Sequence, residues 1–186
     1  NPGESNTCGK RFGHKWKNLP DGYDHKYTFT EFGYNLHMTE PQAALGLSQL
    51  GRIDQIVAAR RKNFEYLIEN LADFNDTLMF MQYNDGVLKP SPFGFPIIVR
   101  KESPFTKVEL VEFLESRNIR TRPIFSGNIT RQPMFDNQRF LVHDTLDGSD
   151  FVMENGCWIG CHPELTEKML EYVVESFYDF KEMKGF

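Results

Sequence analysis

The sequence is poor in cysteine and has no long apolar segment. Its 186 residues include three cysteines, an odd and widely spaced set that does not make a disulfide framework. This usage favours a reducing, cytoplasmic location. No apolar run approaches the roughly 20 residues that a membrane helix needs, and the first residues lack the basic, apolar and small regions of a secretory signal. We therefore expect a cytoplasmic protein without a membrane partner.

Positive charge is not in excess. The chain has 21 Lys and Arg against 26 Asp and Glu, a net charge of −5, which argues against a nucleic-acid partner. Residues 118–132 are an exception, because they hold Arg120, Arg122 and Arg131 and no acidic residue. A basic strip in an acidic chain indicates a small anionic ligand.

Several common catalytic and metal-binding patterns are missing. The chain has no glycine-rich phosphate loop and no nucleophile elbow. His25, His37, His143 and His162 are not paired at ligand spacing. Cys157 and Cys161 stand four residues apart on an expected strand, which is not the spacing of a zinc knuckle, and we expect both to be buried and inert. No residue is identified as a catalytic base.

The apolar pattern predicts one long helix and two shorter ones. Apolar residues recur every three or four positions from Thr39 to about Ala72, with a bend expected near Gly51. Gln42, three residues after Thr39, completes a capping box at the start of that helix. Further helices are expected after the cap residues Thr106, whose box partner is Glu109, and Thr166; Asn118 should end the first of these in a left-handed conformation.

Three strands are expected in the second half of the chain, at 93–100, 119–125 and 156–160, and a weaker one at 27–34. Strands and helices in this order predict an α/β protein whose C-terminal lobe is a small three-stranded α+β domain. We expect 1–73 to contain an irregular loop and the long helix, 74–91 to be a linker, and 92–186 to be a small α/β domain. With 40% hydrophobic residues and 17 phenylalanines, dense packing or a large buried interface is expected.

The entry to the long helix carries a family resemblance. Gly-Tyr-Asn at 33–35, Met-Thr-Glu at 38–40 and Gln-Ala-Ala-Leu-Gly-Leu at 42–47 resemble the sugar aminotransferase and dehydratase (DegT-type) family of fold-type-I PLP enzymes. By itself Asn35 suits a turn before a helix. The resemblance implies that its loop reaches across a homodimer and that Asn35 contacts the PLP phosphate of the neighbouring subunit. An amide beside a helix N-terminus is chemically suited to an anion.

Two further segments resemble one branch of that family, the CDP-4-keto-6-deoxyglucose 3-dehydrases. These are Asn-Thr-Cys-Gly-Lys-Arg-Phe at 6–12 and Gly-Tyr-Asp-His-Lys-Tyr at 22–27. Proteins of this branch hold a [2Fe–2S] cluster, so the resemblance implies that Cys8 is a cluster ligand whose partner cysteines lie upstream of Asn1. Without the resemblance, Cys8 would be interpreted as an ordinary loop thiol.

The basic strip resembles the same branch. Gly-Asn-Ile-Thr-Arg-Gln-Pro at 127–133 is similar to a run in these dehydrases, and Thr-Arg-Pro at 121–123 looks like the strand end that lines the sugar pocket. The resemblance implies that Arg122, Asn128 and Arg131 bind the substrate, since arginine holds diphosphates and carboxylates with paired hydrogen bonds. The alternative is that Arg122 or Arg131 forms a structural salt bridge.

Together these segments imply the C-terminal part of a PLP/PMP-dependent nucleotide-sugar C3 dehydratase, in which 1–73 is the end of the large, cofactor-binding domain and 92–186 is the small domain. Such an enzyme removes the C3 hydroxyl from a nucleotide-linked 4-keto-6-deoxy sugar, acts with a reductase partner, and serves the synthesis of 3,6-dideoxysugars for lipopolysaccharide and other surface polysaccharides. Its catalytic lysine or histidine would lie upstream, so we expect this chain alone to be inactive and to bind neither PLP nor the cluster. A sugar aminotransferase and a non-catalytic interaction domain with the same fold are the alternatives.

Overall fold

The computed structural model describes residues 15, 20, 34, 36, 38–83, 90–136 and 139–186. The chain divides into two units, Asn1–Gly46 and Leu47–Phe186, and each is described by itself. Cys8, Asn35 and, apart from Tyr34, the expected strand at 27–34 lie outside the described residues.

The predicted long helix is two helices. Helix α1 spans Glu40–Leu50 and helix α2 spans Ile53–Asn70, with a turn at residues 51 and 52. The break falls where Gly51 had predicted a bend, because glycine weakens a helix interior. At the start of α1 the backbone N–H of Thr39 donates to the side-chain oxygen of Gln42 at 2.9 Å, as the capping pattern predicts.

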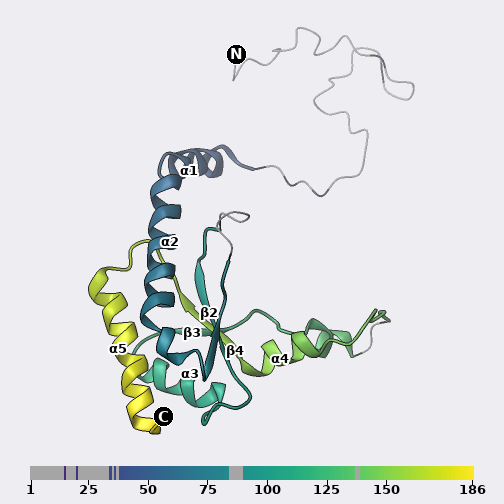
Figure 1. Ribbon diagram of the computed structural model, residues 1–186. Coiled ribbons are helices and arrows are strands. Elements are labelled where there is room, and N and C mark those ends of the chain that lie inside the picture. The colour runs from purple at the N-terminus through teal and green to yellow at the C-terminus, as the bar shows by residue number, and fades with distance from the viewer. Residues whose placement is uncertain are drawn as a thin grey trace. The chain divides into compact units, whose positions relative to one another are not determined.

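The centre of the second unit is a four-stranded antiparallel sheet in the order β1-β2-β4-β3 (Figure 1). The strands are β1 Leu78–Phe80, β2 Gly94–Val99, β3 Thr121–Pro123 and β4 Gly156–Gly160. The last three confirm the predicted strands, with β3 shorter than expected. The prediction of three strands was wrong in missing β1, which is too short to show an alternating pattern. It lies inside the expected linker 74–91, so this part of that range belongs to the sheet.

The remaining elements follow the predicted caps. Helix α3 is Lys107–Ser116 and begins with the complete capping box of Thr106 and Glu109, and helix α5 is Glu167–Lys184, capped by Thr166. Asn118 is left-handed, with φ of 60°, as expected. Helix α4, Asp147–Asn155, was not predicted because its first turns are polar and no cap side chain precedes it. Short 3₁₀ helices span Ala72–Phe74, Ile129–Arg131 and Pro133–Phe135. Within the described part of the chain, no helix has the length and apolarity that a membrane span requires.

The core lies between one face of the sheet and helices α2, α3 and α5 (Figure 1). Phe95, Ile97 and Val99 alternate along β2 and are buried, while the residues between them are not. Facing them are apolar side chains of all three helices, among them Leu67, Leu110, Leu114, Phe177 and Phe180. Ring pairs such as Phe105 and Phe180, with centroids 4.9 Å apart, confirm the dense aromatic packing. The result is a two-layer α/β unit with one sheet face covered by helices.

Glu109 links the capping box to the end of the chain and makes stability depend on pH. The ion pair and hydrogen bond from Lys184, followed by the hydrogen bonds from Thr106, lower the pKa of Glu109 from 4.5 to about 2. A carboxyl whose folded pKa is depressed contributes stability above its unfolded pKa and loses it as pH falls toward the folded value. The free energy of unfolding should therefore decrease between about pH 4.5 and pH 2. Urea unfolding should show that the free energy of unfolding decreases less across this pH window in Glu109→Gln than in the wild type. An equal pH dependence in the two proteins would contradict the low pKa of Glu109.

Helix α1 has no buried residue, and its apolar side chains are exposed. Leu47 is 72% and Leu50 is 59% exposed. Because contiguous apolar patches are rarely left in water, we expect the chain to self-associate through this helix. Light scattering across a concentration series should give a mass above the monomer, and Leu47→Ser with Leu50→Ser should shift it toward the monomer. A wild-type chain that stays monomeric at high concentration would refute the expectation.

Candidate functional site

The second face of the sheet carries a row of side chains that no core helix covers. In the strand register Pro96 of β2 lies opposite Trp158 of β4, and Trp158 lies opposite Arg122 of β3. Pro96 and Trp158 stand between buried neighbours and therefore point away from the core, and Arg122, which is exposed, shares their face through the register. Gly94 makes room for the indole, since a Cβ atom there would lie 2.4 Å from the Trp158 ring. We call the row Pro96, Trp158 and Arg122 the open-face row.

Arg122 lies against Trp158, and no carboxylate among the described residues pairs with its charge. Its guanidinium lies 5.7 Å from the centroid of the indole ring, a cation–π contact. The indole N–H donates to the carbonyl of Pro123 at 2.9 Å, which fixes the ring. Arg122 is exposed, and among the described residues no carboxylate lies within ion-pair distance of it. The guanidinium is therefore oriented and available to an anion.

Phe125, just after β3, has a strained backbone and an exposed ring. Its φ is 49°, in the left-handed region that bulky residues rarely adopt, at a cost of about 1–3 kcal/mol. The ring is 72% exposed. It lies 6.2 Å from the ring of Phe93, which in turn lies 5.2 Å from the indole of Trp158. We call Phe93, Phe125 and Trp158 the aromatic cluster.

Two hollows meet at the turn that carries Phe125, because both are lined by Ile124 and Phe125. One, of about 260 Å³, lies over the open face and is lined almost wholly by apolar residues: Met81, Pro90, Ser91, Pro92, Phe93, Gly94, Pro96, Ile124, Phe125 and Trp158. The other, of about 530 Å³, lies between the turn and α4 and is lined by Ile124, Phe125, Ser126, Gly127, Gly148, Ser149 and Val152. The turn thus separates an apolar hollow from a more polar one.

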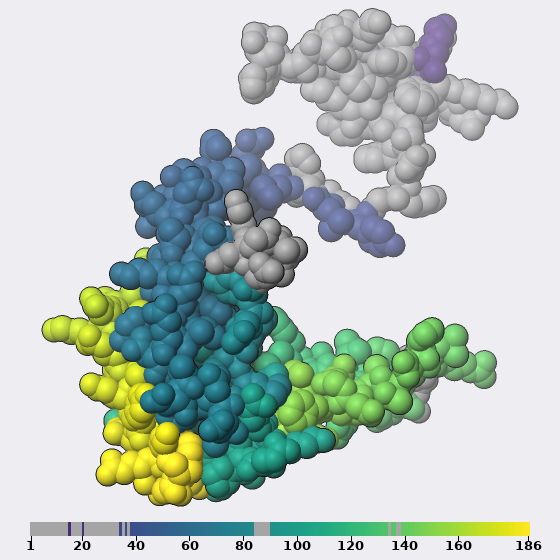
Figure 2. Space-filling model, viewed as in Figure 1, coloured from purple at the N-terminus to yellow at the C-terminus, as the bar shows by residue number. Residues whose placement is uncertain are grey.

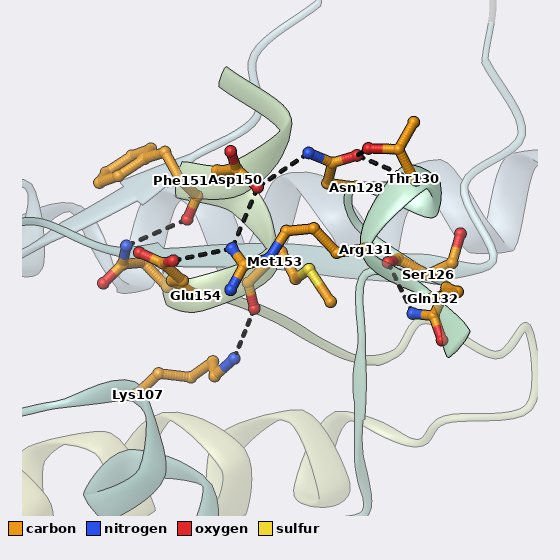
Figure 3. A network of polar contacts seen from close by, with 11 residues as sticks. Lys107, Ser126, Asn128, Thr130, Arg131, Gln132, Asp150, Phe151, Met153 and Glu154 are labelled. Atoms are coloured by element: carbon orange, nitrogen blue, oxygen red, sulfur yellow. Dashed lines mark hydrogen bonds and ion pairs between the residues drawn. The ribbon is translucent and has the colours of Figure 1, made fainter. Parts of the chain in front are cut away.

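A polar network ties the segment after this turn to α4 (Figure 3). Arg131 donates to Asp150 at 3.0 Å and to Glu154 at 2.9 Å. Asn128, only 5% exposed, donates to the same Asp150 oxygen at 2.9 Å and accepts from Thr130. The hydrogen bonds from Asn128 and Arg131 lower the pKa of Asp150, and the bonds to Glu154 and Asp150 raise the pKa of Arg131. Asp150 and Arg131 therefore stay ionised near neutral pH.

Backbone contacts strengthen the link between the turn and α4. Gly127 is left-handed, with φ of 57°, and a Cβ atom there would meet Met153 at 2.5 Å. Only glycine combines this conformation with such a close approach. The ammonium group of Lys107 donates to the carbonyl of Met153 at 2.8 Å. The part of the chain that includes α4 projects from the rest of the Leu47–Phe186 unit (Figure 2), and the contacts at Met153 help to hold it.

The structure therefore gives the predicted substrate residues different surroundings. Arg122 lies on the open face beside Trp158, whereas Arg131 is neutralised by two carboxylates of α4. For Arg131 this geometry is the salt bridge that the sequence had left open as an alternative. Asn128 is buried within the same network. The substrate contacts of Arg122, Asn128 and Arg131 stay predictions.

Sequence reasoning missed the aromatic cluster. Phe93, Phe125 and Trp158 come from three separate segments, and only the sheet register brings them together. One signal was present: Trp158 stands between Cys157 and Ile159 in an alternating strand, so it had to face away from whichever side was buried.

Cys157 and Cys161 are buried, as expected, and do not suit metal binding. Burial raises the pKa of each thiol to about 11, so neither is a thiolate near neutral pH. The thiol of Cys161 donates to the carbonyl of Arg60 at 3.3 Å. His162 accepts a hydrogen bond from the backbone N–H of Glu164 through its ring. In the described part of the chain, no group of three or more His, Cys, Asp or Glu side chains could hold a metal ion.

A further hollow, of about 770 Å³, lies on the helix-covered side of the sheet beside the first turns of α5. Its walls include Ile119, Ile159 and Val173, which are apolar, and the cations Arg117 and Lys168. Arg117 is already paired with Asp179. We take the open face as the candidate site, because an oriented arginine lies there beside exposed aromatic rings.

Removing Arg131 tests whether the polar network holds the turn. In Arg131→Met, Asp150 and Glu154 lose their shared cation and repel each other, so the contact between 124–136 and α4 should loosen. Amide hydrogen exchange should become faster in 124–136 and in α4 and stay unchanged in the core helix α2. Arg120→Met, which removes an exposed arginine of the same basic strip, is the control. Equal exchange in the wild type and Arg131→Met would show that the ion pairs do not hold this segment.

Comparison with known proteins places the chain in a family. Residues 7–178 match the DegT/DnrJ/EryC1/StrS aminotransferase family. The chain is 47% identical over 179 residues to dTDP-4-dehydro-2,6-dideoxy-D-glucose 3-dehydratase of Saccharopolyspora spinosa, covering 96% of this chain and 38% of that protein. It is 45% identical over 181 residues to the lipopolysaccharide biosynthesis protein RfbH of Salmonella typhimurium, covering 96% and 41%. The chain thus spans about two fifths of the length of these relatives.

Solved structures give the same result. The E. coli GDP-4-keto-6-deoxy-D-mannose-3-dehydratase with bound hydrated PLP superposes with a TM-score of 0.73 at 30% identity, covering 81% of this chain and 38% of that one. A variant of GDP-4-keto-6-deoxymannose-3-dehydratase with bound GDP-perosamine gives 0.75 at 28% identity, covering 90% and 42%. The expectation from the helix-entry and strand-end motifs is confirmed: the chain is a member of the DegT/DnrJ/EryC1/StrS aminotransferase family and has the fold of its PLP-dependent enzymes.

Proposed function

We propose that the chain is the C-terminal part of a PLP/PMP-dependent nucleotide-sugar 3-dehydratase similar to CDP-4-keto-6-deoxyglucose 3-dehydrase. The observation that carries the proposal is the open-face row, where an oriented arginine lies at a strand end and has no carboxylate partner among the described residues. Pockets of α/β proteins commonly open at such ends. A nucleotide diphosphate is the anion that the relatives' substrates have in common, since their names specify dTDP and GDP sugars.

Arg122 is the residue best placed to bind the diphosphate. Its guanidinium can donate two parallel hydrogen bonds to phosphate oxygens while its contact with Trp158 keeps it oriented. Asn128 and Arg131, for which the sequence implied direct contact, would orient the turn that borders the site through Asp150. This division follows from charge: Arg122 is unpaired among the described residues, and Arg131 is already paired twice.

The cofactors that the family implies make different demands on this chain. PLP or PMP, when bound, supplies the electron sink for breaking the bond to the C3 hydroxyl. Asn35 is our candidate for contacting its phosphate across a homodimer. A [2Fe–2S] cluster needs thiolates, and the raised pKa values of Cys157 and Cys161 do not fit that need. Cys8 is the cysteine that we propose as its ligand, in a cytoplasmic enzyme that works with a reductase and serves dideoxysugar synthesis.

A sugar aminotransferase is the second candidate, because the family holds both activities. The degree of similarity favours the dehydratase. The chain is 47% identical to a 3-dehydratase but 28% identical to dTDP-4-amino-4,6-dideoxy-D-glucose transaminase of Shigella dysenteriae. A non-catalytic interaction domain with the same fold is the third candidate.

A single assay separates the three candidates. The intact protein is supplied with PMP, a reductase and CDP-4-keto-6-deoxyglucose, and the sugar is followed by NMR. Loss of the C3 hydroxyl supports the dehydratase. Amination at C4 that requires added glutamate would make the protein an aminotransferase. A sugar that stays unchanged when both the reductase and glutamate are supplied would leave the interaction domain.

Replacing Arg122 tests the diphosphate contact. Arg122→Ala should weaken binding of the nucleotide sugar by roughly 1.5–3 kcal/mol, the range for a hydrogen bond to a charged group. The free energy of unfolding should change much less than the free energy of binding, because Arg122 is exposed. Calorimetric titration measures the loss, with Arg120→Ala as the matched control in the same strip. Equal affinities of the wild type and Arg122→Ala would remove Arg122 from the site.

A further inference from the structure

The aromatic cluster is an unusual surface for this chain. Phe93 is 52% and Phe125 is 72% exposed, and both rings border the apolar hollow of about 260 Å³ over the open face. Single exposed apolar side chains are common on proteins. Adjacent exposed rings around a hollow are not, and such patches mark binding sites. The cluster therefore has the features of a site for a flat apolar group.

The backbone of Phe125 shows that the exposed ring is imposed by its surroundings. A left-handed phenylalanine persists only where the neighbouring structure determines it, and residues of this kind gather at ligand sites. On its C-terminal side the chain is fixed by Gly127 against Met153 and by the hydrogen bonds of Asn128 to Asp150. On its N-terminal side the N–H of Phe125 donates to the carbonyl of Pro123 at 2.8 Å. The turn thus holds the ring toward the solvent.

A positive charge stands beside the cluster. Arg122 stacks on Trp158, which is itself a member of the cluster, and it has no carboxylate partner in the described part of the chain. A ligand that satisfies both features carries a flat ring and an anionic group close to each other. A nucleoside diphosphate has this combination.

We propose that the aromatic cluster binds the base of a nucleoside diphosphate by stacking, while Arg122 binds its diphosphate. This inference rests on the proposed function, since it assigns a place to the nucleotide half of the substrate. The indole N–H is already used by the carbonyl of Pro123, and phenyl rings have no hydrogen-bonding groups. The cluster therefore recognises the face of the base and not its edge, which makes it tolerant of base identity.

Titration of the 186-residue chain with CDP, GDP and pyrophosphate tests this assignment. CDP and GDP should bind with affinities within tenfold of each other, and more tightly than pyrophosphate. Phe125→Gly should weaken the binding of CDP by about 5- to 150-fold, the range for losing one stacking partner. The affinity for pyrophosphate should not change. Arg122→Gln should weaken the binding of both CDP and pyrophosphate. In a Trp16→Phe background, CDP should quench the fluorescence of Trp158 and pyrophosphate should not.

Stability separates a binding role from a structural one. Glycine adopts the left-handed conformation without a Cβ penalty, so Phe125→Gly should unfold at the same or a higher temperature. Phe140→Ala, which removes an exposed phenyl ring outside the cluster, is the matched control and should not change CDP affinity. A lower unfolding temperature for Phe125→Gly with unchanged CDP affinity would make the ring structural and overturn the proposal.

Two further outcomes would also overturn it. One is that the wild-type chain does not bind CDP, and the other is that Phe125→Gly reduces self-association while CDP affinity stays the same, which would make the cluster a protein contact. The dehydratase assay is independent of these results. Base-dependent binding that requires Phe125, in an intact protein that does not dehydrate the sugar, would refute the proposed activity and leave the nucleotide site in place.

Discussion

The structure depends on the burial of one face of the sheet. Phe95, Ile97 and Val99 of β2 point to the same side and are almost fully buried against α2, α3 and α5. Removal of this apolar surface from water is the main driving force of such a layer. Because successive side chains of a strand alternate between faces, the same constraint that buries Ile159 sends Trp158 to the opposite, open face. The core and the candidate site are two consequences of one alternation.

The turn after β3 is locally unfavourable, in contrast to the buried face of the sheet. Phe125 combines a left-handed backbone with an exposed ring, and both features disfavour the folded state. The contacts that offset them lie on α4, where Asp150 joins Asn128 and Arg131 and where Met153 packs on Gly127. Each ion pair there is partly exposed, so each contributes modestly. Their number and shared geometry, more than the strength of any one of them, fix the turn.

Family membership and the proposed activity rest on different observations. The family match extends over residues 7–178 and includes the whole sheet and its helices apart from the end of α5. This fold is common to dehydratases and aminotransferases, so it does not separate them. The distinction we propose depends instead on the higher identity to 3-dehydratases and on the cysteine at position 8. The fold therefore identifies the family, whereas the dehydratase activity that we propose depends on sequence similarity and on Cys8.

The sequence by itself determined the local elements. The caps at Thr106 and Thr166, the left-handed Asn118 and the break near Gly51 could all be predicted, because each depends on side chains within four residues of one another. The strands expected at 93–100, 119–125 and 156–160 correspond to β2, β3 and β4, and the sequence motifs predicted the family. Strand β1 and helix α4 were missed since neither has a clear periodic pattern, and their stability comes from pairing with β2 and from contacts to the turn.

Tertiary structure alone decided which of these residues act together. Arg122 and Arg131 looked equivalent in one basic strip, but the fold stacks Arg122 on Trp158 and places Arg131 between two carboxylates more than 18 residues away in the chain. Phe93, Phe125 and Trp158 were unremarked in the sequence and meet through the register of three strands. Such partners cannot be predicted from local patterns, because pairing across a sheet depends on the whole set of apolar side chains that is buried beneath it.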